Sequence, residues 1–166
     1  MAWGTNPKES YKITKAIRDV CCKPLIVKLT PNVTDIAEIA LAVEDAGADV
    51  ISLINTIKAM GIDIKTKKPY LSTITGGLSG PAVKPIALRM VWEVYNAVKI
   101  PITGTGGICN YKDVIEFMLA GASAVQIGTA NFINPKVCIE IIENLKEYCE
   151  NNNIEKISEL TGGLIT

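Results

Sequence analysis

The chain has 166 residues, of which 48% are hydrophobic and 20% charged, and its 17 basic and 17 acidic side chains give no net charge. This composition is typical of one soluble domain with a sizeable core, and it gives no support for broad electrostatic binding of nucleic acid or acidic membranes. The chain contains no histidine, which excludes Ser-His-Asp and Cys-His catalytic sites and every His-ligated metal site. Chemistry would therefore need a cofactor or other acids and bases.

The N-terminal residues and the cysteines bear on location. The first residues do not resemble a leader peptide, and no apolar run approaches the roughly 20 residues of a membrane-spanning helix. The five cysteines form no CxxC pair and are odd in number, which favours reduced thiols. We expect a cytoplasmic protein with no membrane partner and no metal site.

Four short apolar runs are typical of buried parallel strands, with helical patterns between and after them. In chain order, we expect a strand at 24–29, a helix at 35–46, strands at 49–54 and 100–104 separated by a helix at 84–98, a helix at 111–120, a strand at 124–128 and a helix at 134–150. The unit that begins at Pro24 is repeated from Pro101, and each first helix is followed by Ala-Gly-Ala. This alternation predicts a parallel sheet, either doubly wound or closed into a barrel.

The segment 58–81 is too long for a minimal connection between a strand and a helix. Its first part indicates a turn or hairpin, and its second part is rich in glycine. Barrel enzymes place their sites on long loops of this kind. A mobile surface insertion is the alternative.

Polar residues follow the first two strands. Lys28 falls within an apolar run, where burial is costly unless the ammonium meets an anion or a polar ligand edge. We expect Lys28 to contact a ligand, and a snorkelling or salt-bridged lysine is the alternative. Asn55 and Thr56 could bond a planar polar ligand, although such a pair more often forms a turn or a helix cap.

Glycines follow the last two strands. Gly106-Gly107 and Gly128-Thr129 would let backbone N–H groups approach a phosphate, the arrangement found after strands seven and eight of many barrels. The glycines after the third strand do not have the GxGxxG spacing of a dinucleotide site. Cys109 lies nearby, but its place beside a phosphate gives no reason to assign it a catalytic role.

Five segments together resemble class 1B dihydroorotate dehydrogenases in order and spacing, from about residue 3 to the last helix. They are 27–35 (VKLTPNVTD), 54–56 (INT), 74–82 (ITGGLSGPA), 106–107 (GG) and 128–131 (GTAN). The resemblance implies an α/β fold, the C-terminal half of a (β/α)8 TIM barrel with parallel strands five to eight. Residues 1–166 would form a single domain, with the N-terminal half of the barrel not present.

The resemblance also implies an activity, the FMN-dependent oxidation of (S)-dihydroorotate to orotate in pyrimidine biosynthesis. The residues that match cofactor contacts are Lys28, Ile54, Gly80, Gly106, Gly107, Gly128 and Thr129, and those that match substrate contacts are Asn55 and Thr56. In this family the general base is a cysteine on a loop in the first half of the barrel. We therefore expect no catalytic residue in this chain and little turnover by the chain alone.

The family implies partners as well. Electrons would pass to NAD through an electron-transfer subunit that carries FAD and a 2Fe-2S iron–sulfur cluster, in a homodimer or heterotetramer. A half barrel would leave two sheet edges and an apolar interior face uncovered.

Two alternatives remain: a dihydropyrimidine dehydrogenase-type subunit, which shares the Lys-Leu-Thr-Pro-Asn strand end, and a noncatalytic FMN- or phosphate-binding module.

Overall fold

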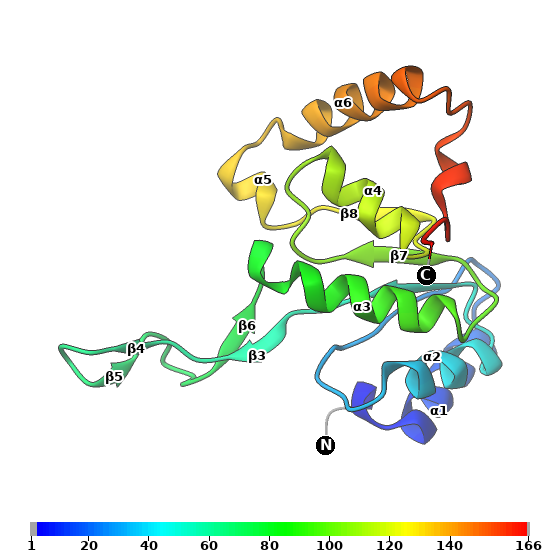
Figure 1. Cartoon of the computed structure of the whole chain (residues 1–166). Coiled ribbons are helices and arrows are strands. Elements are labelled where there is room, and N and C mark those ends of the chain that lie inside the picture. Colours follow the sequence, from blue (N-terminus) through cyan, green and yellow to red (C-terminus); the bar gives the residue numbers. More distant parts are fainter. Residues whose placement is uncertain (1–2, 166) are drawn as a thin grey trace.

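The structure is a computed structural model that describes residues 3–165. At its centre is a four-stranded parallel sheet in the order β1-β2-β7-β8 (Figure 1). The strands are β1 (Ile26–Lys28), β2 (Val50–Leu53), β7 (Ile102–Thr105) and β8 (Ala124–Gln126). They lie side by side in chain order, whereas the strand order of a doubly wound sheet reverses at a switch point. The order is that of a barrel segment, which confirms the predicted fold.

The predicted helices are present, with small differences at their ends. They are α2 (Ile36–Asp45), α3 (Lys84–Tyr95), α4 (Tyr111–Leu119) and α6 (Val137–Asn151). The other described helical elements are α1 (Pro7–Arg18), the short α5 (Ala130–Ile133) and the 3-10 turns η1 (Trp3–Thr5), η2 (Pro81–Val83) and η3 (Ile157–Leu160). Within residues 3–165, no helix is long and apolar enough to cross a bilayer.

The helix α1 (Pro7–Arg18) was not predicted from the sequence. Its start is well marked, because the Asn6 side chain accepts hydrogen bonds from the backbone N–H groups of Lys8 and Glu9, and Pro7 occupies the first helical position. Its apolar residues remain partly exposed, with Ile17 at 43%. The N-cap signal was present in the sequence, but the buried residues of this helix are the polar Ser10 and Thr14, so no apolar run marked its packing face.

The central sheet has one covered and one open face. Val27, Ile51 and Ile102 are aligned across three strands and pack in the hydrophobic core. The next row, which begins with Lys28 and Ser52, points to the opposite face. The prediction that Lys28 is buried was wrong: its side chain is exposed, because it lies on an edge strand and points to the open face.

The open face is not the apolar surface that we expected. Its rows contain Ile26, Val50 and Ala124, but also Lys28, Ser52, Thr103, Thr105 and Gln126. The polar side chains gather toward the carboxyl ends of the strands, whereas Ile26, near the other end, is 56% exposed. This face therefore has an apolar half and a polar half.

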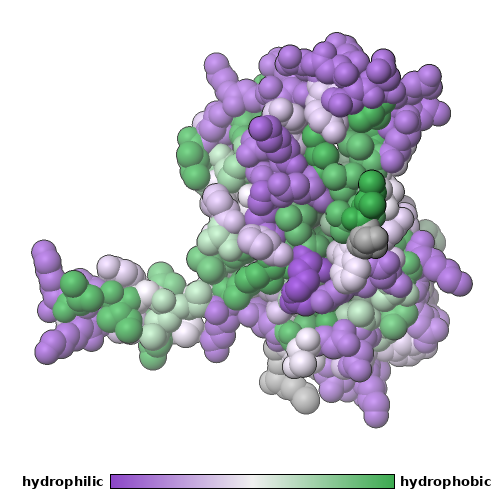
Figure 2. Space-filling view, in the orientation of Figure 1, coloured by the Kyte–Doolittle hydropathy of each residue, from purple (hydrophilic) through white to green (hydrophobic). Residues whose placement is uncertain are grey.

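The segment between β2 and α3 forms a hairpin, as predicted. In it, β3 (Ile57–Ala59) pairs with β6 (Gly76–Leu78), and farther out β4 (Ile62–Asp63) pairs with β5 (Lys68–Pro69). The hairpin projects from the side of the molecule toward which β7 points (Figure 1). Hydrophobic residues lie along it and hydrophilic ones at its tip (Figure 2). The hairpin therefore begins at the carboxyl ends of the central strands, where the predicted ligand residues are found.

Candidate functional site

All nine residues predicted to contact a cofactor or substrate line one cavity of about 270 Å³. It lies at the carboxyl ends of the strands, the face on which barrel enzymes place their sites. Lys28 ends β1, residues 54–56 follow β2, Gly80 precedes η2, Gly106 and Gly107 follow β7, and Gly128 and Thr129 separate β8 from α5. The structure thus brings together residues that are up to 101 positions apart in the sequence, from 28 to 129. Their individual roles remain predictions.

The glycine pair after β7 is required by close backbone packing. Gly107 has a φ of 74°, a conformation that L side chains rarely adopt. A Cβ atom there would lie 2.8 Å from the carbonyl oxygen of Gly80 and 2.9 Å from the backbone nitrogen of Lys84. The loop after β7 therefore touches the loop before α3, backbone to backbone, at one side of the cavity.

Gly128 differs from Gly107, because a Cβ atom at Gly128 would have no neighbour within 4 Å. Its open side belongs to the cavity. Among residues 3–165, the backbone N–H groups of Gly106, Gly107, Gly128 and Thr129 have no hydrogen-bond acceptor. Unpaired N–H donors at the edge of a cavity are suited to bind an anion such as a phosphate.

Three polar side chains that the sequence analysis did not single out meet beside this cavity. The Oε1 atom of Gln126 accepts hydrogen bonds from Oγ1 of Thr105 at 3.0 Å and from Oγ of Ser52 at 3.3 Å. Gln126 and Thr105 line the cavity, and Ser52 is only 2% exposed. The alternation of apolar and polar residues in 102–105 could have indicated Thr105, because alternate side chains of a strand share a face. Ser52 and Gln126 lie in apolar runs that give no such signal.

Residues 54–56 form a local turn and also line the cavity. The Oδ1 atom of Asn55 accepts a hydrogen bond from the backbone N–H of Thr56 at 2.8 Å, so the alternative of a local turn is realised in part. Asn32 fixes the next residues, because its Nδ2 donates to the carbonyl oxygen of Thr56 and its Oδ1 accepts from the backbone N–H of Lys58. The peptide bond between Leu53 and Ile54 is cis.

Two further groups at the cavity carry a charge or a thiol. Among the described residues Lys28 forms no ion pair, so its ammonium has no carboxylate partner in this part of the chain. Cys109 also lines the cavity. Burial, and next the negative charge of Asp113, raise the pKa of its thiol. A thiol that keeps its proton at neutral pH is a poor nucleophile or base.

The chain is similar to known proteins over nearly its whole length. The family model for dihydroorotate dehydrogenase matches residues 1–149. The dihydroorotate dehydrogenase B (NAD(+)) catalytic subunit of Caldicellulosiruptor bescii is 59% identical over 164 residues, which are 99% of this chain and 55% of that protein. The protein of the same name from Parabacteroides distasonis is 60% identical over 164 residues, which are 54% of its length. The chain thus spans about half the length of the curated relatives it matches.

A solved structure supports the fold independently. The DHODH of Eimeria tenella, crystallised in complex with ferulenol, aligns with a TM-score of 0.78 over 95% of this chain and 48% of that chain. The two sequences are 23% identical in this alignment, so the likeness concerns the fold, which is that of about half a TIM barrel. From the family match and the two bacterial relatives we conclude that the chain belongs to the dihydroorotate dehydrogenase family.

Proposed function

We propose that this chain is the C-terminal half of an FMN-dependent dihydroorotate dehydrogenase and binds the phosphate and one side of the flavin. The observation that carries the proposal is the set of unpaired N–H groups at residues 106, 107, 128 and 129 around one cavity. The cavity volume of about 270 Å³ lies slightly below the range of most ligand pockets, which is about 300–1,000 Å³. This volume fits part of an FMN molecule, with the rest enclosed by the other half of the barrel.

The residues of this chain would bind and orient. Bound FMN would supply the two-electron oxidation of dihydroorotate to orotate. The exposed ammonium of Lys28 would attract an electron-rich or anionic part of a ligand, and the amide of Asn55 and the hydroxyl of Thr56 would bond the polar groups of the substrate. By the family resemblance, the general base would be a cysteine in the N-terminal half. Cys109 is poorly suited to replace it, because burial raises the pKa of its thiol.

The electron acceptor and partner belong to the same proposal. The relatives' names specify NAD(+) and a catalytic subunit. On this ground we propose that electrons pass to NAD through a second subunit, which by the family resemblance would carry FAD and a 2Fe-2S cluster. Reduction of the flavin by dihydroorotate but not by dihydrouracil, with the missing half added, would distinguish the proposed activity from that of a dihydropyrimidine dehydrogenase. A noncatalytic module would bind FMN and be reduced by neither.

The phosphate site can be tested with Gly128→Val. Because a Cβ atom at this position would have no neighbour within 4 Å, we expect the melting temperature to be unchanged but the FMN affinity to fall by about tenfold or more, an effect of at least about 1.4 kcal/mol. FMN fluorescence quenching would measure it, on this chain alone and mixed with the N-terminal half of the C. bescii relative.

The control is Gly4→Ala, at a residue that does not line the cavity, where an added Cβ makes only an ordinary contact with Cγ2 of Thr30 at 3.5 Å. It should bind FMN like the unchanged chain. Tight FMN binding by Gly128→Val would contradict the proposed phosphate site, as would failure of the unchanged chain to bind FMN even with the N-terminal half present.

A further inference from the structure

A buried carboxylate behind the glycine loop makes contacts to three segments. Asp113 of α4 is 5% exposed. Its Oδ2 atom accepts hydrogen bonds from the backbone N–H groups of Cys109 at 2.7 Å and Asn110 at 3.1 Å. Its Oδ1 atom accepts a hydrogen bond from Nζ of Lys84 at 2.7 Å. One side chain therefore joins the loop after β7, the start of α4 and the start of α3.

These contacts exceed what capping of α4 needs. In a capping box, the side chain at the third helical position bonds the backbone N–H of the N-cap residue, which here is Asn110. The bond from Cys109 holds a residue that precedes the cap, and the bond from Lys84 comes from another helix. The two additional contacts hold the segment between Gly107 and α4 in place.

Lys84 acts on the same loop from the other side. Its backbone nitrogen would lie 2.9 Å from a Cβ of Gly107, so its main chain packs directly against that glycine. Its Nζ also bonds Oε2 of Glu116 at 2.8 Å. Burial lowers the pKa of the Lys84 ammonium, but hydrogen bonds and charges from Asp113 and Glu116 outweigh burial and leave the pKa raised. The ammonium is therefore charged at neutral pH.

We infer that Lys84 and Asp113 are positioning residues that hold the loop 106–109 so that its N–H groups converge on a phosphate. Neither residue lines the cavity, so they would act through the loop and not through contact with the ligand. Gly107 is held between them, by packing against Lys84 and by the hydrogen bond that the backbone N–H of Cys109, two residues later, donates to Asp113. This inference rests on the proposed FMN site and assigns a function to a pair outside it.

Riboflavin provides the test, because it is FMN without the phosphate. The ratio of the riboflavin and FMN dissociation constants measures the contribution of the phosphate site alone. For Asp113→Asn, we expect this ratio to fall by about tenfold, the effect of losing one well-placed hydrogen bond to a charged group, with riboflavin affinity unchanged. Lys84→Met should act in the same direction, and Lys84→Arg should restore part of the ratio. Titrations would use the chain mixed with the N-terminal half of the C. bescii relative.

The matched control is Glu116→Gln. Glu116 bonds the same ammonium, but among the described residues its side chain forms no hydrogen bond to the loop 106–109, so its variant should keep the unchanged ratio. Two results would overturn the inference while leaving the FMN site intact. One is a riboflavin-to-FMN ratio that changes in neither Asp113→Asn nor Lys84→Met, and the other is an equal loss of affinity for both ligands. If the unchanged chain does not prefer FMN over riboflavin, the phosphate site itself is wrong and the inference is overturned with it. Should Asp113→Asn fail to fold, Lys84→Met decides, because it leaves the acceptors of Asp113 in place.

Discussion

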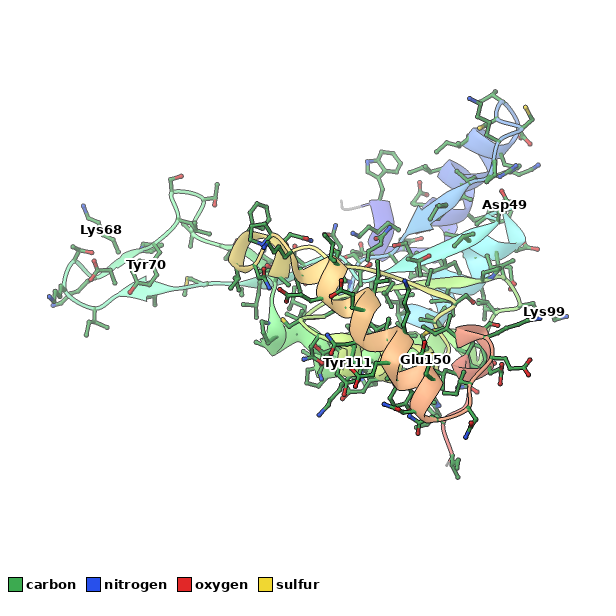
Figure 3. The ribbon with its side chains drawn as sticks, turned by 90° about the horizontal axis from the view of Figure 1, so that it is seen from above. Asp49, Lys68, Tyr70, Lys99, Tyr111 and Glu150 are labelled. Carbon is green, nitrogen blue, oxygen red and sulfur yellow. The ribbon has the colours of Figure 1, made fainter. Side chains whose placement is uncertain are left out.

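One carboxylate holds the N-terminal end of the sheet. The Oδ2 atom of Asp49 accepts hydrogen bonds from the backbone N–H of Leu25 at 2.6 Å and from Nη2 of Arg18 at 2.5 Å. Asp49 lies at the end of the molecule opposite the hairpin that carries Lys68 and Tyr70 (Figure 3). The bond from Leu25, and then the charge of Arg18, lower the pKa of Asp49. This carboxylate therefore links α1, β1 and β2.

The lowered pKa predicts a pH-dependent contribution to stability. An aspartate whose pKa is lower in the folded state stabilises the fold above its unfolded pKa of about 4, and this stabilisation is lost as the pH falls through the folded value. We expect Asp49→Asn to unfold at lower urea concentration than the unchanged chain at pH 7, and this difference should shrink as the pH is lowered below about 4. A difference that persists in full at pH 3 would contradict this assignment. Asp45→Asn, outside this network, serves as the control.

Close packing joins a strand to the helix that follows it. A Cβ atom at Gly104 of β7 would overlap Cδ1 of Phe117 in α4 and lie 3.3 Å from Cβ of Ala122. Phe117 is fully buried. We expect Gly104→Ala to destabilise the fold by about 1–3 kcal/mol through overpacking. In Phe117→Leu the smaller side chain makes room, so the double variant should lose less than the sum of the two single losses. Urea unfolding of the unchanged chain, the two single variants and the double variant measures this coupling. Additive losses of unfolding free energy would show that Gly104 and Phe117 are not coupled by packing.

The sequence predicted elements better than it predicted their surroundings. All four strands, and the helices α2, α3, α4 and α6, carry local apolar patterns that are visible without the fold. The buried residues of helix α1 are the polar Ser10 and Thr14, so its Asn6-Pro7 start was not enough to reveal it. The exposure of Lys28 could not be seen in its apolar neighbours, because it depends on the position of β1 at the edge of the sheet.

The same limit applies to the site. The glycines and the residues 54–56 carry motifs, so they could be predicted, and the structure places them around one cavity. The hydrogen bonds among Ser52, Thr105 and Gln126 depend on the register of three strands, which the sequence does not specify directly. The contacts of Asp113 likewise depend on how α3 and α4 approach the loop after β7.

The whole molecule has two unpaired sheet edges. The order β1-β2-β7-β8 leaves β1 and β8 each without a neighbour on one side among the described residues. Such edges can pair with other strands, and Ile26 on β1 adds an apolar side chain that is 56% exposed. In a closed barrel, both edges would be covered by the strands of the other half. The architecture therefore favours association with a complementary half.

We expect this chain to self-associate when alone and to form a 1:1 complex with the N-terminal half of the C. bescii relative. Size-exclusion chromatography with light scattering would measure both. Ile26→Lys should weaken both associations, because a charged side chain on an edge strand opposes strand pairing and apolar burial. Ile139→Lys on the outer helix α6, where the native side chain is 60% exposed, should change neither. If the chain stays monomeric at high concentration and does not bind the N-terminal half, the expectation is wrong. The sheet edges would then be stable when exposed, and the FMN site would have to function on four strands.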